Sequence, residues 1–183
     1  MSFETNIETI RKQAREHMME GAVTASYGAN REEVCKVLND MLATEIVCAL
    51  RYRNNHYVAL GLGAHRAADE LLEHAAEEES HRSMIAERIT QLGGMPNFDP
   101  STLAKRSHAE YSSKASLGEI LRENLVAERV AVAMYSEIVR WLGDADPTSR
   151  RLVEQVLAQE EEHADDLVDL IQRVEGEWAG RVD

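Results

Sequence analysis

Residues 73–84 read EHAAEEESHRSM, and this stretch decides which kind of fold the chain can form. Glutamates, alanines and a histidine run together here, while Leu71, Ile85 and Ile89 recur at helical spacing on either side. Such a block is either the solvated face of a helix or part of a helix that turns some of its carboxylates into the core. The rest of the sequence distinguishes these two interpretations.

The 183-residue chain has the size and composition of a single helical domain. Aromatic residues make up only 5% and there are three prolines, which favours helix throughout. The formal net charge of −13 opposes binding to nucleic acid or to an anionic membrane, and it suits cations instead. No apolar run approaches the length of a membrane span and the first residues lack a signal sequence, so we expect a cytoplasmic protein.

Apolar periodicity predicts four long helices, which short links pair into two antiparallel hairpins. The helices are expected at residues 31–61, 67–92, 117–142 and 147–174. Ser116 and Glu119 have the spacing of a capping box before the third helix. Asp146, which precedes a proline, is the expected N-cap of the fourth.

The segments between and outside these helices complete the predicted architecture. Residues 93–115 are too long for a tight turn and suit a crossover, with room for a short helix after Pro100. Residues 1–30 carry an amphipathic helical pattern of mixed charge, and we expect an N-terminal helical extension that packs on a partner surface. Residues 31–175 form the bundle and residues 176–183 a short C-terminal tail. The expected fold is all-α, an antiparallel four-helix bundle with one long crossover and an extra N-terminal helix.

The two hairpins resemble each other in sequence. ATEIVCALRY (43–52) matches VAERVAVAMY (126–135), and each has a glutamate that is followed seven residues later by a tyrosine. EEESH (77–81) matches QEEEH (159–163), so each second helix carries the pattern Glu-x-x-His. Both hairpins therefore bring one glutamate on their first helix and a glutamate–histidine pair on their second.

Four of these glutamates lie on the apolar stripes of their own helices. A helix turns about 100° per residue, so each side chain can be placed relative to its apolar neighbours. The glutamates that fall within the stripes are Glu45, Glu78, Glu128 and Glu160. His81 and His163 lie beside them, three residues after a stripe glutamate, whereas Glu77 and Glu79 are expected to be flanking or surface charges. Measured from the hairpin loops, the six inward groups lie at one depth of the bundle.

Four carboxylates at one level of a core require a physical explanation. A single glutamate near an apolar stripe is usually a boundary residue that reaches water. Four together would repel each other and resist ionisation, unless two divalent cations balanced their charge. Carboxylate oxygens and imidazole nitrogens suit iron or manganese. The pattern therefore predicts a dinuclear metal site made by Glu45, Glu78, His81, Glu128, Glu160 and His163.

At these residues the sequence resembles the bacterioferritins and the Dps-like ferritins, over most of residues 31–174. The segment RITQLGGMPNF (88–98) also looks like the bacterioferritin segment that leaves the second bundle helix. A glutamate from each of two helices and Glu-x-x-His from each of the other two is the arrangement of ferritin-like di-iron and di-manganese proteins. The resemblance implies a ferritin-like bundle with two iron ions, or manganese ions, inside each subunit.

The resemblance also implies a role for each group of the predicted site. Glu78 and Glu160 would bridge the two irons. The terminal ligands would be Glu45 with His81 on one iron and Glu128 with His163 on the other. Tyr52 matches a tyrosine near the bacterioferritin site, and it is either a core aromatic or a redox group.

Three departures from the resemblance bear on cofactor and assembly. Bacterioferritins bind haem between subunits through a methionine directly after the glutamate of the second helix. Here that position is Glu79, so no haem is expected by that route. Only 20 residues follow His163, which leaves little room for the fifth short helix of 24-subunit cages. The long crossover suits the extra helix of the Dps proteins. The last two features favour a 12-subunit shell over a 24-subunit shell.

The function that the resemblance implies is a ferroxidase and iron-storage protein. It would oxidise Fe(II) with O2 or H2O2 and keep Fe(III) inside a homo-oligomeric shell. One alternative is a manganese catalase or a substrate-oxidising di-iron enzyme on the same bundle. A further alternative is a Dps-like stress protein that coats DNA, which the acidic charge and the mixed charge of the N-terminal helix oppose.

Four smaller candidates complete the sequence interpretation. His74 lies one turn before the central glutamate of the opening stretch, and it is either a metal access group, a supporting group or a satisfied bundle histidine. His56 and His65, near the first hairpin loop, are expected at the surface. Cys48 follows Glu45 by three residues, and it is either a plain buried thiol, which we favour, or a thiol that lies near the metals.

Overall fold

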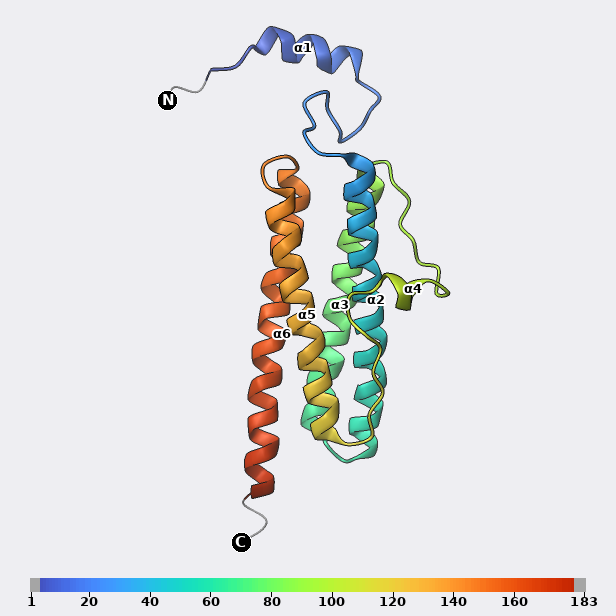
Figure 1. Ribbon diagram of the computed structural model, residues 1–183, viewed down its shortest axis with the longest axis vertical. Helices are drawn as coiled ribbons and strands as arrows, with labels where there is room; N and C mark the ends of the chain where they lie inside the picture. Colours follow the sequence, from blue (N-terminus) through green and yellow to red (C-terminus); the bar gives the residue numbers. More distant parts are fainter. Residues whose placement is uncertain (1–3, 180–183) are drawn as a thin grey trace.

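The computed structural model describes residues 4–179, with side chains described as far as residue 176. Within this range the chain forms helices and no strands (Figure 1). The helices are α1 (Ile7–Glu16), α2 (Arg31–Gly61), α3 (His65–Gln91), α4 (Leu103–Arg106), α5 (Leu117–Leu142) and α6 (Pro147–Ala179). None of the described helices is both long and apolar enough to span a membrane.

The four long helices pack into a bundle of two hairpins. Helix α2 packs along α3, and α5 packs along α6, while α2 also contacts α5 and α3 contacts α6. Short loops join each hairpin, so its two helices run antiparallel (Figure 1). The all-α four-helix bundle predicted from the sequence is confirmed.

The helix boundaries follow from the local sequence. Ser116 caps α5 by accepting a hydrogen bond from the Glu119 amide at 3.4 Å, and Asp146 accepts one from the Ser149 amide at 2.9 Å at the start of α6. Helix α3 begins two residues earlier than predicted, because Gly63 adopts a φ of +75° and completes the turn in fewer residues.

Helix α6 is longer than predicted. It continues past the expected end near residue 174 to Ala179, so the first part of the expected C-terminal tail is helical. The residues that follow Val174 include glutamate and alanine, which favour helix, and the single Gly176 does not interrupt the hydrogen-bonding pattern. Residues 1–3 and 180–183, which belong to the expected N-terminal extension and the expected tail, lie outside the described residues.

The apolar core is divided into two parts along the bundle axis. One cluster lies toward the start of α2 and includes Leu38, Met41 and Ile89. The other lies toward the end of α2 and includes Ala59, Leu71 and Leu167. Every long helix contributes to both clusters. The predicted site residues fall between them, so the bundle has a polar layer enclosed by apolar side chains.

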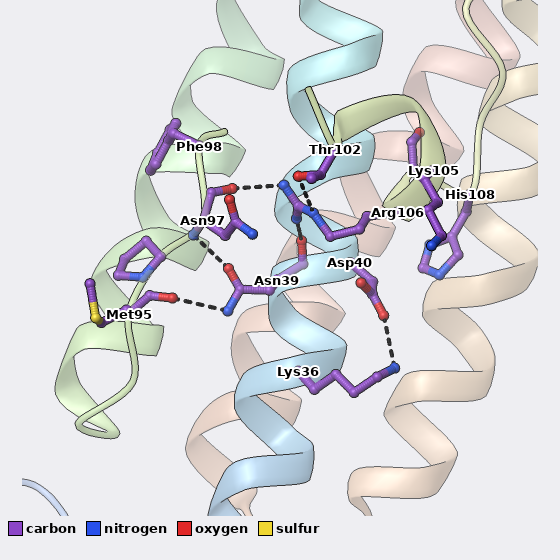
Figure 2. Close-up of a pocket in the computed structure, with 12 residues that line it drawn as sticks. Lys36, Asn39, Asp40, Met95, Asn97, Phe98, Thr102, Lys105, Arg106 and His108 are labelled. Carbon is purple, nitrogen blue, oxygen red and sulfur yellow. Dashed lines mark hydrogen bonds and ion pairs between the residues drawn. The ribbon is translucent and has the colours of Figure 1, made fainter. Parts of the chain in front are cut away.

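The crossover between α3 and α5 is fastened to α2, and it contains the short helix expected after Pro100 (Figure 1). Asn39 of α2 donates to the Met95 carbonyl at 3.2 Å and accepts from the Asn97 amide at 2.7 Å (Figure 2). Arg106 of α4 donates to the carbonyls of Asn39 at 2.6 Å and Asn97 at 2.9 Å (Figure 2). The hollow drawn in Figure 2 is lined by this crossover and α2, and none of the predicted site residues lines it.

The N-terminal extension forms a helix that stands apart from the bundle. Helix α1 lies beyond the end of the bundle where α2 begins (Figure 1), and none of its residues is buried. The linker that follows returns to the bundle, where Val23, Tyr27 and Ala29 pack against the nearer apolar cluster. The expectation that α1 packs on a partner surface remains a prediction.

Candidate metal centre

The six residues predicted to form a site meet in the polar layer of the bundle. Glu45 comes from α2 and Glu128 from α5. The Glu-x-x-His pairs come from α3 and α6. Each of the six is at most 1% exposed: Glu45, Glu78, His81, Glu128, Glu160 and His163. The stripe positions deduced from helical periodicity therefore do face the interior.

Potential ligand atoms of these residues gather into two overlapping groups of four. In each group the atoms lie within 4.8 Å of one another. The first group consists of Glu45, Glu78, His81 and Glu160. The second group consists of Glu78, Glu128, Glu160 and His163. Glu78 and Glu160 belong to both, which is the geometry that two ions bridged by two carboxylates require.

Both histidines direct the same ring nitrogen into the cluster. His81 Nδ1 lies 3.0 Å from a Glu45 oxygen and 3.1 Å from a Glu160 oxygen. His163 Nδ1 lies 3.3 Å from Glu160 and 3.7 Å from Glu78. The two imidazoles therefore approach the shared carboxylates from opposite hairpins.

The other ring nitrogens are held by a glutamate and a glutamine in equivalent positions of the two hairpins. His163 Nε2 contacts Glu77 at 2.7 Å and His81 Nε2 contacts Gln159 Oε1 at 2.9 Å. Gln159 in turn donates its amide hydrogen to Glu77 at 2.9 Å. Because both partners present oxygen acceptors, each Nε2 carries the hydrogen, and Nδ1 is the nitrogen that can bind a metal.

Glu77 is a flanking charge, as one of the two sequence-based expectations has it, but its contacts with the cluster were not predicted. Its side chain is 33% exposed, yet one carboxylate holds both His163 and Gln159. Periodicity measures the angle from the stripe of α3 alone, while Glu77 faces the neighbouring α6. Glu79 behaves as expected and forms an ion pair with Arg82 at the surface.

Two tyrosines hold the terminal glutamates across the hairpins. Tyr52 of α2 donates a hydrogen bond to Glu128 of α5, and Tyr135 of α5 donates one to Glu45 of α2. The sequence interpretation named Tyr52 and treated Tyr135 only as part of an apolar stripe. The repeat contained the missing signal, since each tyrosine follows its glutamate by seven residues.

Several buried polar atoms in the cluster have no hydrogen bond of acceptable geometry. They are Oε1 of Glu78, Oε2 of Glu128, both carboxylate oxygens of Glu160 and Nδ1 of His163. Unsatisfied buried polar atoms are costly and rare in folded proteins. Two cations between the shared carboxylates would bind these atoms, so the donor set fits a dinuclear metal centre.

The ionisation of the cluster reflects the crowding of its buried carboxylates. Burial, followed by repulsion from Glu160 and Glu45, raises the pKa of Glu78 well above its usual range. Burial and Glu160 likewise raise the pKa of Glu128. Burial alone would lower the pKa of His81, but its contacts with Glu160 and Glu45 outweigh burial and raise it. Protons therefore occupy positions that cations would take.

Three of the smaller candidates from the sequence are buried in the structure. Cys48 is buried and free, and burial followed by the charge of Glu78 raises its pKa, so it is a buried thiol that lies close to the cluster. His56 was expected at the surface and is buried instead, with Nδ1 2.7 Å from the carbonyl of Ala68. His74 is also buried, which lowers its pKa to about 3.

The chain is similar to known proteins of the ferritin-like kind. A family model described as ferritin-like domain matches residues 35–176, a range that contains all six buried groups. A bacterioferritin of Mycobacterium leprae is 26% identical over 138 residues, which cover 73% of this chain and 80% of that protein. A DNA protection during starvation protein of Pyrococcus furiosus is 30% identical over 140 residues, which cover 74% and 75%.

A solved structure extends the likeness to nearly the whole chain. A dodecameric thioferritin, described as the bacterioferritin-related protein from Bacteroides fragilis, superposes with a TM-score of 0.80 at 26% sequence identity. The match covers 97% of this chain and 100% of that one. With its ferritin-like bundle and a family match over most of its length, the chain belongs to the ferritin-like domain family.

Proposed function

We propose that the protein is a ferroxidase that stores or detoxifies iron. Two Fe(II) ions are its substrate at the buried cluster, O2 or H2O2 is the oxidant, and Fe(III) is kept inside a shell of identical subunits. The observation that carries the proposal is the pair of buried ligand groups that share Glu78 and Glu160. A mononuclear site would need only one such group.

The chain's own residues perform three tasks in this function. Glu78 and Glu160 hold both ions at once, so that two electrons are available to one oxidant molecule. A pair of Fe(II) ions supplies two electrons, which with two protons reduce O2 to H2O2, or H2O2 to two water molecules. Tyr52 and Tyr135 keep the terminal carboxylates turned inward, and the two apolar clusters exclude bulk water.

The proposed assembly is a 12-subunit shell. The Bacteroides fragilis relative is dodecameric, and the chain aligns with all of that structure. The crossover contains α4, where the Dps-like ferritins have an extra helix. Large apolar side chains are exposed on the bundle, among them Tyr57 at 65% and Val126 at 58%, and subunit contacts would cover them. The acidic net charge of −13 favours Fe(II) near the shell.

Two competing functions remain: a manganese catalase or substrate-oxidising di-iron enzyme, and DNA protection. The first uses the same buried cluster, so metal analysis with parallel catalase and Fe(II) oxidation assays separates it from a ferroxidase. DNA protection is part of the name of the Pyrococcus furiosus relative. Tight DNA binding at physiological salt in a gel-shift assay would favour it over iron storage as the main function.

The double variant Glu45→Ala with Glu128→Ala tests the proposed function. It removes one terminal carboxylate from each ligand group and should slow the initial rate of Fe(II) oxidation by more than about 100-fold, because loss of outer partners alone costs about 10- to 100-fold. The matched control, Glu33→Ala with Glu137→Ala, removes exposed glutamates from the same two helices. Circular dichroism should show intact helices in both. Unchanged oxidation kinetics in the cluster variant would refute the proposal.

A further inference from the structure

A second group of potential metal ligands lies next to the buried cluster. It consists of Glu70 and His74 on α3 and Asp166 on α6, whose ligand atoms lie within 4.8 Å of one another. His74 Nε2 is 3.9 Å from a Glu70 oxygen and 3.8 Å from an Asp166 oxygen. None of the three belongs to the six residues of the proposed dinuclear centre.

His74 distinguishes this group from an ordinary acidic surface patch. The residue is only 2% exposed, and neither of its ring nitrogens has a hydrogen-bond partner. Burying an imidazole without a hydrogen bond costs the full desolvation free energy of its polar atoms. A cation bound between Nε2 and the two carboxylates would offset that cost.

The position of His74 links this group to the cluster. Its ring stacks on that of His163, with centroids 4.2 Å apart and an interplanar angle of 19°. Its other neighbour is Tyr52, whose ring meets it edge-on at a centroid distance of 5.1 Å. The carboxylates of Glu70 and Asp166 are 35% and 46% exposed, so the group reaches from solvent to the wall of the cluster.

The chemistry of the group selects a class of ion. Two carboxylates balance the charge of one divalent cation, and the solvent side leaves room for water ligands. The imidazole nitrogen favours iron, manganese, cobalt or zinc over magnesium or calcium. Incomplete protein coordination also makes the ion exchangeable, in contrast to the enclosed cluster.

We propose that Glu70, His74 and Asp166 form a third, mononuclear site. It binds Fe(II) on the solvent-facing side of α3 and α6 and supplies this Fe(II) to the dinuclear centre. The supply role rests on the proposed ferroxidase function. The binding of a cation does not, because it follows from the geometry of the three residues alone. The two parts are therefore tested by separate measurements.

Anaerobic equilibrium dialysis with Co(II) tests the binding part. The native chain should bind three Co(II) ions, and the variant Glu70→Gln with Asp166→Asn should bind two. The control variant, Glu73→Gln with Asp165→Asn, removes exposed carboxylates from the same helices and should still bind three. Equal Co(II) numbers and affinities in the native protein and the Glu70/Asp166 variant would overturn the site, whatever the oxidation activity.

Stopped-flow oxidation at limiting Fe(II) tests the supply part. In the Glu70/Asp166 variant the initial rate should fall about tenfold, in the range that charged access sites contribute to association rates. The amplitude at saturating Fe(II) should stay unchanged, since the dinuclear centre is intact. A variant that loses the third Co(II) ion but oxidises Fe(II) at the native rate would remove the supply role. Absence of oxidation in the native protein would refute the ferroxidase proposal, while the dialysis still decides whether the site exists.

Discussion

Two clusters of buried charge lie in the same bundle, and they differ in how far their hydrogen bonding is satisfied. Beside the α5–α6 loop, Asp146 accepts hydrogen bonds from Arg88 at 3.0 Å and from Tyr27 at 2.7 Å. The Ser149 amide and hydroxyl also donate to it, at 2.9 and 2.6 Å. In the middle of the bundle, by contrast, the carboxylates of Glu78, Glu128 and Glu160 keep unsatisfied oxygens.

The contrast separates structural from functional burial of charge. The network of Asp146 is complete within the protein, because the first turn of α6, the N-terminal linker and α3 all supply donors. The central cluster has more acceptors than donors, and protons fill part of the deficit. Complete networks stabilise a fold, whereas the unsatisfied buried oxygens of the central cluster are positions that bound cations would satisfy under the proposed function.

The largest expected effect is on the free energy of unfolding, which should respond differently to substitutions in the two clusters. Asp146→Ala should lower the free energy of unfolding by about 3–5 kcal/mol, because it leaves Arg88 as an uncompensated buried charge. Glu128→Gln should change the stability of the metal-free protein by less than about 1.5 kcal/mol, the range for isosteric replacements. The reason is that the raised pKa of Glu128 already favours its neutral form. Urea unfolding of both variants measures the difference.

Iron binding should show the opposite order in the same variants. Glu128→Gln weakens Fe(II) binding, and Asp146→Ala leaves it intact at temperatures where the protein is folded. If Glu128→Gln destabilised the metal-free protein as much as Asp146→Ala, the cluster would be a structural network and the distinction would fail.

A smaller effect is expected from the tyrosines that hold the terminal glutamates. Tyr135→Phe and Tyr52→Phe should each weaken Fe(II) binding about 10- to 100-fold, as is common when the partners of metal ligands are removed. The two variants should behave alike, because the hydrogen bonds are equivalent in the two hairpins. Anaerobic Fe(II) titration checks this. A loss of oxidation rate in the Tyr52 variant alone, with equal Fe(II) affinities, would assign Tyr52 a redox role.

The smallest expected effect, taken per pH unit, is that of pH on Fe(II) affinity. The pKa values of Glu78 and Glu128 are raised in the metal-free protein, and so is that of His81. These groups must lose protons to bind Fe(II), so affinity should rise with pH. Release of one proton gives about a tenfold change in apparent affinity per pH unit. Titrations between pH 6 and 8 measure the slope of Fe(II) affinity against pH. The Asp146 network should not affect this slope. A flat profile would contradict the ionisation described for the cluster.

The sequence predicted the fold and the six inward groups because both depend on periodicity. Glu45 and Glu128 are separated by nearly the same number of residues as His81 and His163, which is visible only as a repeat, and the helical angle then places each pair inside. The capping role of Asp146 and the short helix in the crossover were predicted from local signals in the same way.

Contacts between neighbouring helices were harder to predict. Glu77 lies off the stripe of α3 but faces Gln159 and His163 on α6, and no single-helix pattern contains that information. His56 was assigned to the surface because it is near a loop, yet it is buried and its Nδ1 contacts the carbonyl of Ala68 on α3. The unpartnered state of His74 likewise depends on all its neighbours at once.

The most direct test of the dinuclear centre is anomalous diffraction at the iron edge from crystals prepared with Fe(II) without oxygen. Two peaks per chain are predicted within the cluster, each beside Glu78 and Glu160. One peak should also contact Glu45 and His81, and the other Glu128 and His163. Fewer than two iron peaks in the cluster would contradict the account.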